Sequence, residues 1–289
     1  MASLFIRITN KRRKLTMKKN NLKANAAVAF LLSAGILSAP TAMAASASSS
    51  LGSIEIIAIP LSPGASLTWT GDYDWSSSVA YTTNPYQYDN HWDNNSDWNS
   101  FLGTLASTSG ANASSSSTPS ANGPTLLNIA NASIESAPSW DYWEYSYAQA
   151  YSGDQRSFST TGNMAIYISA DYSLSADPGN GLTSGYAYAD ASLNAYFSGT
   201  VGHHTSYSYY NASDYVYASA YPWWNDGVQS SADTFSIGIL TTGTGYGSIT
   251  GNSDAYAYQY AMPVPEPETY AMLLVGLGLI SFTLRKKEA

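Results

Sequence analysis

The sequence has no cysteine and almost no positive charge outside its two ends. Its 289 residues include 12 Lys and Arg against 20 Asp and Glu, which gives a formal net charge of −8. Eight of the basic residues lie within positions 1–23 and three at 285–287, so Arg156 is the only one between Ala45 and Val264. The same stretch holds 17 acids, so its charge is 1 − 17 = −16. Such a body cannot neutralise phosphates, which excludes electrostatic binding of nucleic acid.

The missing cysteines exclude disulfides, cysteine–zinc sites, thiol nucleophiles and lipidated cysteine anchors. Aliphatic residues are scarce as well. Leu, Ile, Val and Phe make up 31 of the 220 residues at 45–264, a fraction below the ~20 per cent at which disorder becomes the default. Tyr and Trp supply another 31, and each aromatic side chain buries about 150–250 Å². We therefore expect a folded body with an interior of aromatic residues and alanine, against the alternative of a disordered polymer.

The N-terminal segment 1–44 has the layout of a cleavable secretory signal. A basic stretch that begins at Met17 is followed by the apolar run 26–37, which is shorter than the ~20 residues that span a bilayer. Small residues then occupy positions −3 and −1 of a cleavage site. The residues of this expected site are Ala42, Ala44 and Ala45. We expect the Sec machinery and signal peptidase to act here. Residues 1–16 are either an extended basic region of the signal or the result of a mis-assigned start, and we favour Met17 as the true start.

A second apolar run lies near the C-terminus. Residues 270–284 carry no charge and are followed at once by Arg285, Lys286 and Lys287. Because basic residues stay on the cytoplasmic side, the pattern predicts a single transmembrane helix over 270–284 with the body outside the inner membrane. Fifteen residues reach roughly 22 Å, which is short for a ~30 Å hydrocarbon core. The alternative is a buried C-terminal helix of the body.

Pro265, Glu266 and Pro267 stand just before that run. The two prolines keep the glutamate in an extended segment with few backbone donors, which a processing enzyme can bind as an open strand. The trio, the glycine-containing apolar run and the basic terminus together resemble the PEP-CTERM sorting signal over residues 265–289. The resemblance implies a Gram-negative, exopolysaccharide-producing bacterium and recognition by an exosortase. It also implies a transient inner-membrane anchor with the body in the periplasm, followed by release to the cell surface or extracellular matrix.

Apolar and polar residues alternate with a period of two along the body 45–264. The pattern predicts half-buried antiparallel strands and an all-β body, a β-sandwich or jelly roll. The strongest alternation occurs in Trp143–Tyr151, Met164–Leu174, Tyr186–Tyr196 and Tyr256–Met262. Further strands are expected around Ser53–Leu61, Ser66–Trp69, Thr125–Ala130, Tyr215–Tyr221 and Phe235–Thr241. Residues 107–123, nearly all Ser, Thr, Ala, Asn and Gly, are expected to form a flexible loop or linker.

No set of catalytic residues stands out in the body. A nucleophile elbow and a phosphate-binding loop are missing, and the acids are scattered singly, so no carboxylate pair can be assigned. The adjacent pair His203 and His204 lacks a third ligand at a diagnostic spacing, so we expect it to be exposed rather than metal-bound. We therefore assign no catalytic residue and no cofactor, and expect a non-enzymatic protein.

Calcium is the one metal for which the sequence holds a weak candidate. Asp93, Asn95 and Asp97 alternate like the first ligands of a calcium loop, but Trp98 replaces the turn glycine and Thr104 replaces the closing acid. We favour a solvated loop that binds calcium weakly at most. Two further acids carry the same weak suggestion. They are Asp72 and Asp74.

Four tryptophans are the best candidates for a sugar-binding platform, because exposed aromatic faces stack on the apolar faces of sugars. They are Trp140, Trp143, Trp223 and Trp224. In a chain so poor in Leu and Val, however, we expect most of these rings to be needed in the core. A platform would require an aromatic row exposed on one face of a sheet.

The first functional interpretation is an exported, non-enzymatic structural protein of the surface or matrix, with exopolysaccharide as a partner. The alternatives are a carbohydrate-binding β-sandwich module, a secreted glycosidase, or a fibre in which strands such as Tyr186–Phe197 pair edge to edge.

Overall fold

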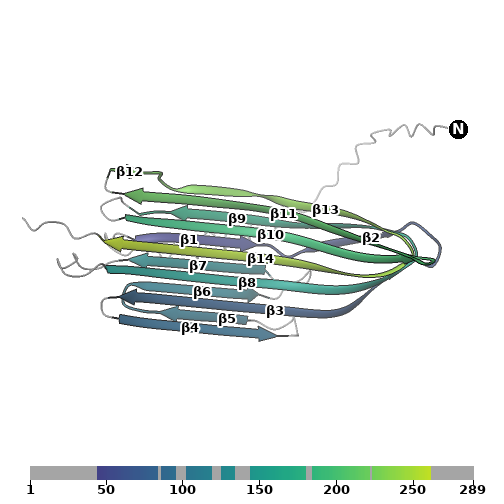
Figure 1. The fold of residues 1–289 in the computed structure, drawn as a ribbon, viewed down its shortest axis with the longest axis horizontal. Helices are drawn as coiled ribbons and strands as arrows, with labels where there is room; N and C mark the ends of the chain where they lie inside the picture. Colours follow the sequence, from purple (N-terminus) through teal and green to yellow (C-terminus); the bar gives the residue numbers. More distant parts are fainter. Residues whose placement is uncertain are drawn as a thin grey trace, which may run out of the picture. The chain divides into compact units, whose positions relative to one another are not determined.

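The computed structural model describes residues 44–83, 86–95, 102–118, 125–133, 144–179, 184–221 and 223–261, all within the unit Met43–Ala289. Every regular element in these ranges is a β-strand, as the alternation predicts, and all the strand pairs are antiparallel. Seven strands form each of two sheets, which pack against each other as a sandwich (Figure 1). The expected helices at 26–37 and 270–284 lie outside the described residues.

Sheet A has the order β13-β9-β1-β7-β6-β5, and β2 pairs with β9 beyond the end of β1. Its strands are β1 (Ala44–Leu51), β2 (Glu55–Pro60), β5 (Leu102–Ser107), β6 (Ala111–Thr118), β7 (Thr125–Ser133), β9 (Met164–Asp177) and β13 (Gln229–Thr241). Sheet B has the order β12-β11-β10-β14-β8-β3-β4. Its strands are β3 (Ser66–Thr83), β4 (Tyr86–Asn95), β8 (Glu144–Thr161), β10 (Ser184–Val201), β11 (His204–Tyr221), β12 (Trp224–Asn225) and β14 (Thr244–Ala261).

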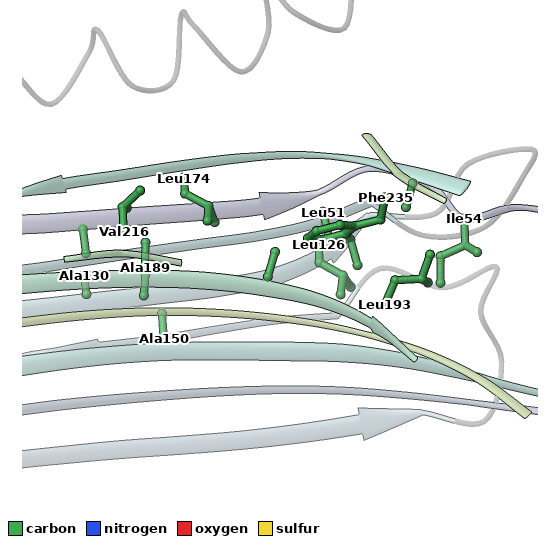
Figure 2. Packing of buried hydrophobic residues seen from close by; sticks show 14 of the residues in the cluster. Leu51, Ile54, Leu126, Ala130, Ala150, Leu174, Ala189, Leu193, Val216 and Phe235 are labelled. Atoms are coloured by element: carbon green, nitrogen blue, oxygen red, sulfur yellow. The ribbon is translucent and has the colours of Figure 1, made fainter. Parts of the chain in front are cut away.

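The apolar part of the interior is built from alanine, aliphatic residues and phenylalanine, and the expectation of an aromatic-plus-alanine interior is wrong for tyrosine. Along the Tyr/Ala strands of sheet B the alanines face sheet A and are fully buried. They are Ala148, Ala150, Ala187, Ala189, Ala255 and Ala257. Larger buried side chains such as Leu51, Leu126 and Leu193 fill the space between the sheets (Figure 2). Alanine lets the sheets approach closely, which leaves no room for tyrosine on that face.

Two Ser-rich segments form strands that the sequence does not reveal. Ala111–Thr118 is strand β6, paired with β5 and β7, so the expectation of a flexible segment over 107–123 is wrong for these eight residues. Ala44–Leu51 is strand β1, which lies between β7 and β9. In both strands every second residue is buried, and the buried residues are alanine, serine or leucine. Both strands are held by backbone pairing and bury small side chains. They therefore lack the large apolar residues that usually reveal a strand in a sequence.

Strand order also corrects two other expectations. Tyr186–Phe197 lies in β10, which is paired on both sides by β11 and β14 and therefore has no free edge. Asp93 and Asn95, expected to lie in a solvated loop, are part of strand β4 (Tyr86–Asn95) at the edge of sheet B. Its pairing with β3 extends from Thr83 opposite Tyr86 to Asp74 opposite Asn95.

Candidate binding surface

Tyrosine rings cover the outer face of sheet B because residues alternate between the two faces of a strand. The register of the sheet places Tyr88, Tyr81, Tyr147, Tyr258 and Tyr186 opposite one another on five neighbouring strands. With neighbours on the same strands these rings form a continuous row, here called the tyrosine ladder. Its members are Tyr81, Tyr86, Tyr88, Tyr145, Tyr147, Tyr186, Tyr217, Tyr256 and Tyr258. The ladder crosses six strands, or roughly 24 Å at about 4.8 Å per step.

Rings in the middle of the ladder lie face to face. The ring centroids of Tyr186 and Tyr258 are 5.1 Å apart, and those of Tyr81 and Tyr147 are 5.7 Å apart, with interplanar angles of 27° and 29°. Stacking at this separation is favourable beyond the area that it buries. Because neighbouring rings cover each other's faces, the centre of the ladder presents ring edges and hydroxyl groups to solvent. Open ring faces are left to the ends of the row.

Several phenol groups of the ladder hold their protons more firmly than an ordinary tyrosine. Burial raises the pKa values of Tyr147, Tyr256 and Tyr258 above the ordinary value of 10. The hydrogen bond with Tyr145 is the main reason that the pKa of Tyr81 rises to about 12. Phenols that keep their protons can both donate and accept hydrogen bonds, as sugar hydroxyls also do.

A loop with two exposed tryptophans follows β11 at one edge of sheet B. Trp223 and Trp224 are 78% and 61% exposed, so the expectation that these rings belong to the core is wrong. The Trp223 ring stacks with Tyr221 at 6.3 Å and 16°. Large exposed aromatic side chains in an ordered loop are typical of a binding surface. We call residues 223–227 the tryptophan loop.

One carboxylate holds the tryptophan loop in shape. Asp226 accepts hydrogen bonds from the indole Nε1 of Trp224 at 2.7 Å, and from the backbone N and Oγ of Ser219 at 2.9 and 2.7 Å. The Ser219 hydroxyl contributes most to lowering the pKa of Asp226, so this carboxylate is ionised at neutral pH. Gly227, with a φ of 69°, supplies the left-handed turn that follows. The Trp224 ring is therefore positioned before any ligand arrives.

A second group of ionisable residues lies inside the sandwich and is closed to solvent. Asp74 and Asp154 stand opposite each other on β3 and β8 and are each 1% exposed. The Nε of Arg156 is 3.3 Å from an Asp154 carboxylate oxygen. Burial raises the pKa of Asp154 to about 8 despite this cation, and it also raises the pKa of Asp74. A polysaccharide cannot reach these carboxyl groups, so they belong to the architecture rather than to a surface site.

The structure places some of the sequence-predicted site residues and leaves others outside its described ranges. Asp93 and Asn95 lie in β4, and the described residues contain no group of three acids or histidines that could hold a metal. His203 and His204 are exposed at the β10–β11 turn, as expected. Ala44 and Ala45 begin β1. The predicted residues outside the described ranges are Ala42, Asp97, Trp140, Trp143, Pro265, Glu266, Pro267, Arg285, Lys286 and Lys287.

Sequence reasoning missed the tyrosine ladder as a surface. The signal was present in the Tyr/Ala alternation of three strands, since a stripe of alanines is smooth enough to pack against a second sheet. It also missed the role of Asp226, whose three hydrogen bonds depend on the path of the turn. The part of the chain that the structure describes contains no helix long and apolar enough to cross a membrane.

Comparisons with known proteins address the tail and say little about the body. No curated protein matches the chain. A solved structure of Bacillus subtilis oxalate decarboxylase aligns over 70% of this chain and 68% of its own, at 8% sequence identity and a TM-score of 0.09. That score is too low to support any argument about fold or function. The model of the PEP-CTERM protein-sorting motif, in contrast, matches residues 263–287. The chain therefore carries a PEP-CTERM protein-sorting motif at residues 263–287, and this motif supports an exported protein that is targeted to an exosortase.

Proposed function

We propose that the exported protein binds a neutral polysaccharide with the tryptophan loop and the adjoining end of the tyrosine ladder. The observation that carries this proposal is the pair Trp223 and Trp224, which are 78% and 61% exposed although Asp226 fixes the loop. Large aromatic rings that stay exposed and ordered are suited to stacking on the apolar face of a sugar. An aromatic row on one sheet face is the feature expected of a carbohydrate-binding module.

Charge and hydrogen bonding favour a neutral polymer over an acidic one. The body has a formal charge of −16 over residues 45–264, so a polyanion would be repelled. Phenol groups such as those of Tyr81 in the ladder and Tyr188 on the same face, with pKa values raised to about 12, can donate hydrogen bonds to sugar oxygens. The site therefore combines stacking at the loop with uncharged donors along the sheet.

We propose further that the role is structural and non-enzymatic, at the cell surface or in the extracellular matrix. Glycoside hydrolysis uses two carboxyl groups on either side of the scissile bond. The register brings two pairs of acids opposite each other. Asp74 and Asp154 are sealed in the interior, whereas Asp190 and Asp254 are partly buried on the outer face of sheet B. Burial therefore keeps a polysaccharide away from the first pair only. The exposed aromatic surface supports a binding role, and the sorting motif supports the extracellular location.

Affinity electrophoresis of the exported protein in gels that contain polysaccharide tests the binding site. The panel contains the polymer from the producing cells, a neutral β-glucan and an acidic alginate. We expect retardation by a neutral polymer and an at least tenfold weaker apparent affinity after Trp223→Ala and Trp224→Ala, since each 1.4 kcal/mol is tenfold. Tyr167→Ala is the matched control, because this ring is 44% exposed on the outer face of sheet A. Equal loss in the control variant, or no retardation of wild type, contradicts the proposal.

Export and sorting are tested separately. We expect the mature chain to begin at Ala45, and N-terminal sequencing of exported protein checks this directly. Changing Pro265 and Pro267 to alanine should trap the body in the inner membrane, as measured by fractionation and immunoblotting. A double variant that is released like wild type and with the same mass would show that the motif is not the processing signal.

A further inference from the structure

The last long strand of sheet B has an open edge. β11 comprises 18 residues and pairs with β10 in an uninterrupted register, but on its other side β12 covers only Ala220 and Tyr221. The other strands at the sheet edges are shorter, with 13 residues in β13, 10 in β4 and 6 in β5. β11 therefore offers the longest row of backbone groups without a neighbouring strand among the described residues, and within this row the N–H of Tyr215 is bound to the Asp214 carboxylate.

This edge lacks the usual devices that prevent pairing between molecules. Proteins protect edge strands with lysine, proline, bulges or shortness. β11 contains no Lys, Arg or Pro, its register with β10 has no bulge, and Asp214 is its only acid. The Asp214 carboxylate accepts the backbone N–H of Tyr215 at 2.9 Å and also binds the Tyr172 hydroxyl at 2.8 Å, so it is occupied within its own molecule. The edge itself therefore places almost no charge against a partner strand, although the −16 of each body opposes association and makes it dependent on salt.

The direction of the free backbone groups is known from the end of the strand. The backbone N–H of Ser219 donates to the Asp226 carboxylate, and the backbone carbonyl of Ser219 accepts from the backbone N–H of Asp226. Both backbone groups of Ser219 therefore point away from β10. Backbone groups alternate in direction along a strand, and the odd-numbered residues before Ser219 therefore also point to the open edge. The same residues direct their side chains to the outer face of sheet B, as the exposed Tyr207, Tyr209 and Tyr215 illustrate.

The outer-face residues of β11 are arranged almost symmetrically about Ala212, with tyrosines at equal distances along the strand on either side. In order they are Tyr207, Tyr209, Asn211, Ser213, Tyr215 and Tyr217. An antiparallel pair centred on Ala212 places Tyr207 opposite Tyr217 of the second copy and Tyr209 opposite Tyr215 of the second copy. Shifting the centre to Asn211 or Ser213 leaves fewer tyrosines opposite tyrosines. The strand is thus complementary to itself in one register.

We propose that the protein forms a two-fold dimer by pairing β11 with β11 of a second copy, centred on Ala212. Odd-numbered residues of both copies then exchange backbone hydrogen bonds, and each molecule keeps the same outer face. Side chains on each molecule already connect this edge to the ladder, since Tyr186 and Tyr217 have ring centroids 6.0 Å apart, and Tyr188 and Tyr215 6.1 Å apart. Opposed tyrosines stabilise antiparallel pairs. The dimer joins the two tyrosine ladders into one surface.

A cysteine scan of the exported protein tests the register, because the natural chain has no cysteine. At the two-fold centre, Ala212→Cys faces itself across a Cα separation of about 4.5 Å, within the range of a disulfide. Ser213→Cys is two residues out of register with itself, at roughly 8 Å, which is too far. Under mild oxidation we expect a covalent dimer from the first variant at least tenfold faster than from the second. Equal rates, or no dimer from Ala212→Cys, would overturn the proposal.

A charge exchange provides a second readout that does not depend on oxidation. Sedimentation velocity should show wild type as a dimer at tens of micromolar. The double variant Tyr209→Lys with Tyr215→Lys places like charges opposite each other and should be monomeric, whereas Tyr209→Lys with Tyr215→Glu should restore the dimer. Both changed side chains are exposed, at 68% and 65%, so circular dichroism should show an unaltered fold. A monomeric wild type, or equal behaviour of the two double variants, refutes the pairing.

Discussion

The two halves of the sandwich interior are built on different chemistry. Between β9 and β10 the sheets meet through apolar side chains such as Ile166, Ile168 and Leu193, each 1% exposed or less. Between β6 and β8 they meet through serines and the buried charges of Asp154 and Arg156. The apolar half gains stability from removing surface from water. The polar half must instead satisfy each group with a partner, which makes it more specific and more easily damaged.

The largest expected effect comes from removing the single cation of the polar half. Arg156→Met leaves the carboxyl groups of Asp74 and Asp154 buried together without their positive neighbour. Loss of one member of a buried ion pair costs about 3–5 kcal/mol. We expect a decrease of that size in the free energy of unfolding, measured by urea denaturation of the exported protein at pH 9, where Asp154 is ionised because its pKa is about 8. Arg156→Lys, which keeps the charge, is the control and should lose clearly less.

The corresponding change in the apolar half should cost somewhat less. Leu193 is fully buried, and Leu193→Ala removes apolar contacts and leaves a cavity, for an expected loss of about 3 kcal/mol. Leu240→Ala removes the same atoms from a side chain that is 70% exposed and should change stability little. If the two leucine variants lose equal stability in urea, the apolar half is not packed as described.

Lowering the pH should stabilise the polar half. Burial raises the pKa of Asp154 from 3.8 to about 8, so the protonated form is favoured in the folded state. The resulting stability is complete below about pH 4 and disappears as the pH rises through 8. The raised pKa of Asp254, about 6, acts in the same direction. We expect a higher melting temperature at pH 5 than at pH 9, and a smaller difference for Asp154→Asn.

The smallest expected loss of stability comes from removing a single hydrogen bond, rather than a charge, in the polar half. The amide of Asn128 donates to Ser152 Oγ at 2.9 Å and to the backbone oxygen of Ser253 at 2.8 Å. Ser152→Ala removes one of these acceptors, at a cost of about 1 kcal/mol. The exposed Ser230→Ala on β13 serves as the control. A loss for Ser152→Ala as large as that for Arg156→Met would mean that the hydrogen-bond network, rather than the ion pair, dominates this half.

The fold class was predictable because alternation with a period of two is visible wherever the inward residues are apolar and the outward residues are polar. Met164–Leu174 shows this clearly, and β9 buries the expected side chains. Which side of the Tyr/Ala strands is buried was not predictable, since alanine and tyrosine are both compatible with an interior. In the structure the two sheets approach closely, so the alanine side of these strands is buried. This close approach is a property of the two sheets together and cannot be inferred from either strand alone.

The missed elements share a physical cause. β1 and β6 bury alanine and serine in place of large apolar residues, so their stability depends on neighbours that are distant in sequence. Trp223 and Trp224 stand out in the sequence as possible sugar-stacking residues, but their exposure was not predicted, because the chain's shortage of Leu and Val favoured placing them in the core. Their exposure depends on the hydrogen bonds of Asp226, and those form only once Ser219 and the turn are in place. The sorting motif was readable because it works as a linear sequence.

The central position of the last strand has a consequence for the order of events during export. β14 is inserted between β8 and β10, and it ends at Ala261, four residues before Pro265. Sheet B therefore cannot close until nearly the whole body has been made available, and long-range pairing of this kind is slow. We expect this order to keep an exported chain unfolded for as long as a secretion channel requires. Pairing of β14 would then be the last step in closing the sheet, next to the sorting motif in the sequence.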